Sequence, residues 1–74
     1  MTNKGIYSRG HQSLARKLIQ ARRQAGLDQV EVAKLLKKSQ SHISKIELGE
    51  RRIEALELQA LVKIYRKPIT HFLK

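Results

Sequence analysis

The sequence feature that most constrains the fold is a very short break between two helical segments. Apolar residues recur at helical spacing over 29–36 and again over 40–48, and only Lys37, Lys38 and Ser39 separate the two segments. Helices joined by so few residues cannot pack side by side in antiparallel fashion and must cross steeply. The break therefore predicts an all-α fold built around two short, crossed helices.

Capping residues mark the ends of both helices. Asp28 precedes the first helix, and Glu31 follows three residues later, which makes an acidic analogue of the capping box. Ser39 is a good cap for the second helix, and Gly49 ends it. Two capped helices that cross in this way constitute a helix-turn-helix.

One more helix is expected before this pair. Ser13 is a good N-cap, apolar residues at helical spacing follow it, and Gly26 stops the helix, so we expect a helix over 13–25. Residues 1–12 lack apolar periodicity and contain basic residues such as Lys4. We expect them to form a flexible basic arm.

Two further helices are expected after the pair. A helix begins near Glu54 and ends before Pro68, because the residue before a proline avoids helical angles. A short fifth helix over 69–73 completes a compact five-helix bundle, with residues 13–74 as the domain. The expected core comprises Leu14, Leu18, Leu27, Val32, Ala33, Leu36, Ile43, Ile46, Ile53, Leu58, Leu61, Val62 and Tyr65.

The charge of the chain is large and unevenly distributed. Sixteen Lys and Arg residues against six Asp and Glu residues give a net charge of +10. All the acids lie within 28–57, where basic residues balance them, whereas 1–27 and 58–74 hold basic residues and no acid. Solubility needs a smaller charge than this. We therefore expect the chain to bind a polyanion.

Several classes of protein are disfavoured by composition. The chain has no cysteine, so it forms no disulfide and no thiolate metal site. No apolar run reaches the roughly 20 residues of a membrane-spanning helix, and residues 1–11 hold no apolar segment of a secretory signal. His11, His42 and His71 lie far apart without acidic partners at useful spacing. We expect a cytoplasmic domain that is not an enzyme and has no cofactor or metal ion.

The run AGLDQVEVAKLLKKSQSHISKIELGERRI resembles the Cro/repressor-type, or XRE-class, helix-turn-helix DNA-binding domains. The family pattern has an apolar residue, a capping residue and Gln, then a small Ala, a Ser or Thr, an Ile and an I-E-x-G ending. These positions are here Leu27, Asp28, Gln29, Ala33, Ser39, Ile43 and 46–49. The tail ALELQALVKIYRKPITHFL looks like the last two helices of the family. The resemblance implies a lambda-repressor-like fold and a small bacterial or phage transcription regulator that binds double-stranded DNA.

Two positions depart from the family pattern. The turn between the two crossed helices usually holds Gly and an apolar residue, whereas this chain has Lys37 and Lys38. A left-handed Lys costs about 1 kcal/mol relative to Gly. Ile19 stands where the family usually has a polar or basic residue, which could mark a contact surface.

The resemblance also implies which residues meet DNA. The helix over 40–48 should lie in the major groove, where Gln40 could pair with adenine and Lys45 with guanine. The residues expected to contact DNA are Gln29, Lys38, Ser39, Gln40, Ser41, Ser44, Lys45, Arg51 and Arg52. Glu47 is expected to pair with Arg22 as structural support. For His42, a phosphate contact and a packing role remain equally open.

One such domain reads only a half-site, so a homodimer is expected. The candidate self-association surface comprises Ile64, Tyr65, Ile69, Phe72 and Leu73, although these residues could instead close the core. The same domain could serve as an antitoxin with a toxin partner or as a restriction-modification controller. Two other readings are a protein-interaction adaptor that has lost DNA reading and a nonspecific polyanion-binding peptide.

Overall fold

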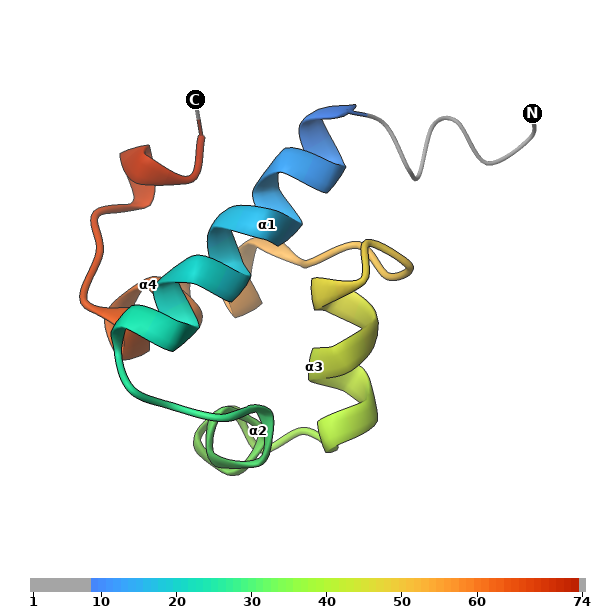
Figure 1. Cartoon of the computed structure of the whole chain (residues 1–74), viewed down its shortest axis with the longest axis vertical. Helices are drawn as coiled ribbons and strands as arrows, with labels where there is room; N and C mark the ends of the chain where they lie inside the picture. The colour runs from blue at the N-terminus through green and yellow to red at the C-terminus, as the bar shows by residue number, and fades with distance from the viewer. Residues whose placement is uncertain (1–8, 74) are drawn as a thin grey trace.

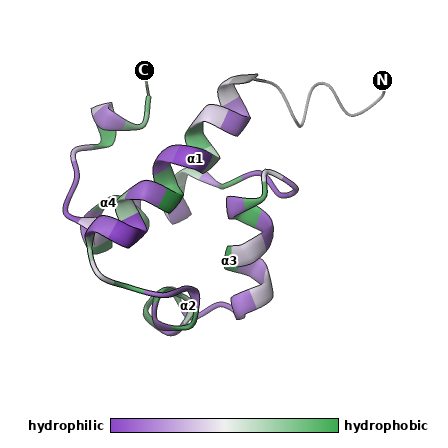
Figure 2. Cartoon of the chain, viewed as in Figure 1, coloured by the Kyte–Doolittle hydropathy of each residue, from purple (hydrophilic) through white to green (hydrophobic). Residues whose placement is uncertain are grey.

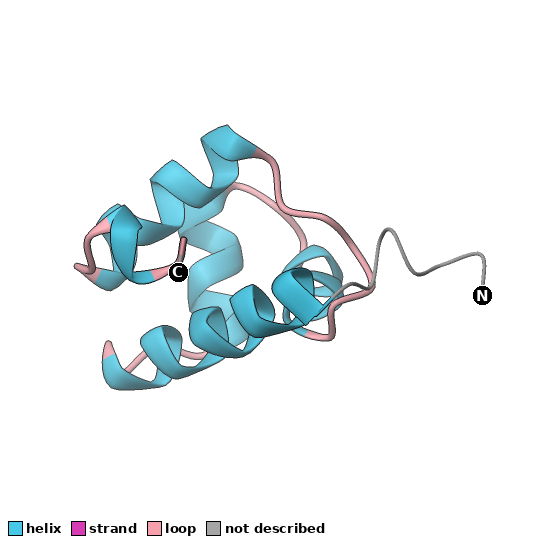
Figure 3. Cartoon of the chain, turned by 90° about the horizontal axis from the view of Figure 1, so that it is seen from above, coloured by secondary structure: helices cyan, strands magenta, loops and turns pink. Residues whose placement is uncertain are grey.

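The computed structural model describes residues 9–73, and over that range its regular elements are all helices, joined by loops (Figures 1 and 3). The elements are α1 (Arg9–Gln24), α2 (Gln29–Leu36), α3 (Gln40–Glu47), α4 (Ala55–Tyr65) and a 3-10 turn, η1 (Ile69–His71). These bounds confirm the all-α prediction and the positions of the two central helices.

Helix α1 begins earlier than predicted. Arg9, not Ser13, opens the helix, so Ser13 lies inside it and does not cap it. The reason is that the inward face of α1 continues back through a polar residue. His11 is half-buried one turn before the buried Ala15, and apolar spacing alone does not reveal it. Residues 9–12 therefore belong to α1, and the rest of the predicted arm lies outside the described residues.

The predicted fifth helix is a single 3-10 turn. The amide of His71 donates to the carbonyl of Pro68 at 3.0 Å, and the amide of Phe72 donates to that of Ile69 at 3.0 Å. This i to i+3 pattern gives one tight turn instead of an α-helix. Its effect is to place Phe72 in the core, where the residue is 3% exposed.

The junction between α2 and α3 adopts left-handed geometry at Lys37, although Lys stands where the family usually has Gly. Lys37 has φ 60° and ψ 43°, and the amide of Lys38 donates to the carbonyl of Ala33 at 2.9 Å. Figure 1 views α2 nearly end-on while α3 runs along the plane of the picture. The two helices thus cross steeply, as the short break requires.

The caps predicted for α2 and α3 also form. The Asp28 carboxylate accepts the amide of Glu31 at 2.8 Å, and the Glu31 carboxylate accepts the amide of Asp28 at 2.9 Å. The Ser39 hydroxyl oxygen accepts the amide of His42 at 3.1 Å. Gly26 and Gly49 follow α1 and α3 with φ of 75° and 77°, which a glycine adopts without steric cost.

The core lies between all four α-helices, and every residue predicted for it is buried there or packed against it. Along α1, stretches of opposite hydropathy alternate, as expected for a helix with one face turned inward (Figure 2). The predicted core left out three buried apolar residues: Ala15, Ala21 and Phe72. Ile19 is half-buried, so it is not the fully exposed apolar residue that the family pattern implied.

The burial of two aromatic residues corrects the predicted self-association surface. Tyr65 is 4% exposed and Phe72 is 3% exposed, so both close the core and are not available to a second copy. Ile64 is half-buried. Only Ile69 and Leu73 of that predicted surface are exposed.

Candidate nucleic-acid interface

Helix α3 presents a polar face to solvent and an apolar face to the core. Ile43 and Ile46 are buried on the inner face. The outer face carries the predicted base-reading residues: Gln40, Ser41 and Lys45 are exposed, and Ser44 is half-buried. The apolar face thus fixes α3 in place while the polar face stays accessible.

The end of α3 is tied to α1 by an ion pair. The Arg22 Nε atom donates to Glu47 Oε2 at 2.7 Å, and Arg22 Nη2 donates to Glu47 Oε1 at 3.2 Å. Arg22 Nη1 donates to the carbonyl of Leu27 at 2.9 Å. The hydrogen bond to Glu47 raises the pKa of Arg22 above its ordinary value, against a smaller opposing effect of burial. The predicted pairing of these two residues is therefore present.

The same carboxylate begins a chain of hydrogen bonds that reaches the outer face of α3. Gln29 Nε2 donates to Glu47 Oε1 at 2.9 Å, and Gln40 Nε2 donates to Gln29 Oε1 at 3.1 Å. The Gln40 amide group keeps its carbonyl oxygen and one N–H for a further partner. Those are the two groups that a glutamine uses to bind the N6 and N7 edge of adenine.

Gln29 has a structural contact that the sequence did not reveal. It was predicted as a phosphate-contacting residue at the first turn of α2, and the structure places it half-buried between Glu47 and Gln40. The separation of 11 residues between Gln29 and Gln40 gives no local signal. The steep crossing of α2 and α3 brings their first turns together.

A second side-chain contact fixes the other side of α3. His42 Nε2 lies 2.7 Å from Glu57 Oε2, and the amide of Glu54 donates to Glu57 Oε1 at 3.1 Å. Burial raises the pKa of Glu57, but the hydrogen bonds from Glu54 and His42 and the charge of Lys38 outweigh it. The net effect is a pKa below the ordinary value. The half-buried His42 thus packs between α3 and α4, which was one of its two predicted roles.

Three of the residues predicted to contact DNA come together. Lys38, Arg51 and Arg52 line one hollow of about 520 Å³ beside the N-terminus of α4. All three are exposed. The other predicted DNA-contacting residues lie outside this hollow. Among residues 9–73, no group of three or more His, Asp or Glu side chains is placed to hold a metal ion.

Residues 18–72 match the helix-turn-helix family model, which spans most of the chain and both crossed helices. The chain belongs to the XRE-type helix-turn-helix family. As a member of this family it is a DNA-binding domain of the transcription-regulator type, and such domains are generally not enzymes. The XRE-type domain matches no curated protein. In its described part, no helix is both long and apolar enough to cross a membrane.

Proposed function

We propose that this XRE-type domain binds double-stranded DNA sequence-specifically, with α3 in the major groove, and regulates transcription. The observation that carries the proposal is the hydrogen-bond chain from Glu47 through Gln29 to Gln40. A side chain held in this way loses little rotamer freedom when it meets a base. Its remaining N–H and carbonyl oxygen match the edge of adenine.

The other predicted contacts divide into base reading and phosphate binding. We assign the exposed Lys45 to donate to guanine, and Ser41 and Ser44 to the same base-reading face of α3. Lys38, Arg51 and Arg52 line a hollow that also includes Glu54 and Glu57. We assign the three basic side chains to phosphate contacts. Gln29 and Ser39 lie at the first turns of their helices, where main-chain amides favour a phosphate.

We also propose that the domain acts as a homodimer, because one α3 reads only a half-site. Ile69 and Leu73 remain as exposed apolar residues for such contact. Support for the dimer would come from the symmetry of the DNA that it selects.

The test is selection of bound sites from random double-stranded DNA, followed by sizing of the complex. A two-fold symmetric consensus with two copies bound is the expected result. Absence of any consensus would overturn sequence-specific reading. A consensus without symmetry, with one copy bound, would overturn the homodimer alone.

A further inference from the structure

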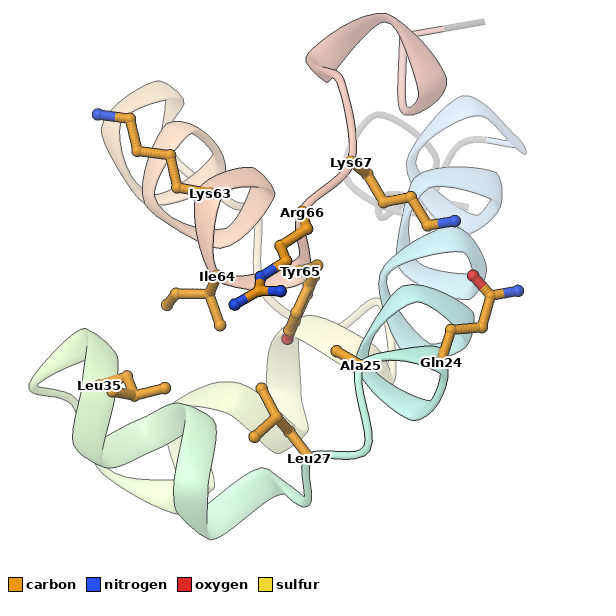
Figure 4. Close-up of a pocket in the computed structure, with 9 residues that line it drawn as sticks. All are labelled: Gln24, Ala25, Leu27, Leu35, Lys63, Ile64, Tyr65, Arg66 and Lys67. Atoms are coloured by element: carbon orange, nitrogen blue, oxygen red, sulfur yellow. The ribbon is translucent and has the colours of Figure 1, made fainter.

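A second hollow lies on another part of the molecule, between the end of α1, helix α2 and the end of α4 (Figure 4). It measures about 780 Å³ and is open to solvent. We call it the α2–α4 groove. None of its lining residues belongs to α3 or to the loops on either side of α3. The groove is therefore separate from the surface proposed to meet DNA.

Apolar side chains from three elements line the α2–α4 groove. Leu27 follows α1, Leu35 comes from α2 and Ile64 comes from α4 (Figure 4). Leu27 and Ile64 pack against the core, whereas Leu35 is 59% exposed and is not part of the core. A single exposed leucine is common. Here two further apolar side chains, those of Leu27 and Ile64, line the same hollow.

The margin of the groove carries only positive charge. Lys63, Arg66 and Lys67 are among its lining residues, and no acid is. Figure 4 shows the Arg66 guanidinium directed into the hollow, between Ile64 and Tyr65. Arg66 takes part neither in the Arg22–Glu47 ion pair nor in the His42–Glu57 contact. Its charge is thus available to a partner.

This charge pattern excludes some occupants and favours one. In a two-fold contact through this groove, a second copy would bring its own Lys63, Arg66 and Lys67 against the same residues. A partner with carboxylates around an apolar stripe complements both properties of the groove. Arg66 can bind one carboxylate through two parallel hydrogen bonds.

We propose that the α2–α4 groove binds an acidic, amphipathic helix of a partner protein. The apolar stripe of that helix would cover Leu35, Ile64 and Leu27, and a Glu or Asp beside the stripe would pair with Arg66. This binding does not depend on the DNA-reading function. Because the two surfaces share no residue, duplex DNA and the partner helix can be bound at once.

The probe is a synthetic helix with leucine along one face and glutamate on the others, titrated into the isotope-labelled full chain. The amide NMR signals of Leu35, Ile64 and Arg66 should shift, and a saturating DNA duplex should leave the peptide affinity within about twofold. Replacing the peptide leucines by alanine should weaken binding at least about tenfold. Equal binding of both peptides would mean that charge alone attracts them. That result would overturn the proposal that the apolar groove binds the helix.

Two substitutions test the named contacts. Leu35→Glu and Arg66→Glu should each lower the affinity for the glutamate-containing peptide by about tenfold or more, because each adds repulsion in the groove. Both positions are exposed, so the fold should persist. Leu56→Glu is the matched control, because Leu56 is 78% exposed on α4 outside the groove. A Lys-containing peptide should regain affinity for Arg66→Glu; no such recovery would overturn the proposed carboxylate pairing.

Two outcomes would assign the groove to another occupant and so overturn the proposal. One is a concentration-dependent dimer of the free chain that Leu35→Glu dissociates, which would mean that a second copy covers the groove. The other is displacement of the peptide by duplex DNA together with NMR shifts at Leu35 and Arg66. That result would assign the surface to nucleic acid and leave sequence-specific reading by α3 untouched.

Discussion

The guanidinium of Arg22 and the carboxylate of Glu47 form two hydrogen bonds that join the last turn of α1 to the end of α3. Their side chains are 12% and 6% exposed, so water screens the pair only weakly. The second Glu47 oxygen also accepts from Gln29, which in turn accepts from Gln40. One carboxylate therefore contributes both to the stability of the fold and to the orientation of a residue proposed to read DNA.

Loss of the arginine should destabilise the fold. Arg22→Ala leaves Glu47 buried without its cation, which should lower the free energy of unfolding by about 3 kcal/mol. The site preference on DNA should not change, since Gln29 still contacts Glu47 and Gln40. Urea denaturation gives the first quantity and site selection gives the second. Arg23→Ala, at the exposed neighbouring position, should change stability by less than about 0.5 kcal/mol. An altered consensus for Arg22→Ala would contradict a structural role.

The left-handed residue after α2 predicts a stabilising substitution. Lys37 has φ 60°, a conformation that glycine adopts without a steric penalty. Lys37→Gly should raise the free energy of unfolding by about 1 kcal/mol. Lys34→Gly, inside α2, should lower it by about 1 kcal/mol. If both glycines destabilise the domain equally, the turn does not adopt this geometry in solution.

The depressed pKa of Glu57 predicts a loss of stability in acid. The ordinary pKa is 4.5, and the folded value lies below it. Its contribution is therefore complete above about pH 4.5 and is lost as the pH falls through the folded pKa. Chemical denaturation at a series of pH values measures the free energy of unfolding, with Glu57→Gln as the comparison. The variant should lose less stability on acidification than the parent chain, and an identical loss would argue against the contacts from His42 and Glu54.

DNA binding should depend steeply on salt, because phosphate contacts release counterions. Arg51→Ala should reduce the slope of log Kd against log salt by about 1. Lys63→Ala should leave the slope unchanged, because Lys63 lies at the α2–α4 groove and away from α3. Anisotropy titrations of a labelled duplex at several salt concentrations give both slopes. Equal changes for the two variants would mean that only the total charge matters.

Local chemistry explains why much of this fold was predictable. The caps at Asp28, Glu31 and Ser39 satisfy amides only three residues away. Their roles can therefore be predicted from the sequence. Gly26 and Gly49 stop helices for an equally local reason. Apolar spacing identified the core because every helix turns one face inward. The pairing of Arg22 with Glu47 came from the family resemblance and not from local pattern.

The features that escaped prediction depend on how distant segments meet. The contact between His42 and Glu57 spans 15 residues, and neither side chain carries a local signal for it. The start of α1 was misplaced because the half-buried His11 is not apolar. The end of the chain was assigned an α-helix, whereas a 3-10 turn suffices to bury Phe72. Each case needs the arrangement of the bundle to be known first.

The central claim is that Gln40 on α3 reads a base. Its most direct test is the ratio of Kd on random DNA to Kd on the selected site, for the parent chain and for Gln40→Ala. Gln59→Ala, an exposed glutamine on α4, is the matched control. If Gln40 contacts a base, Gln40→Ala lowers this ratio about tenfold or more, while the affinity for random DNA stays nearly constant. An equal loss on both DNAs would contradict it.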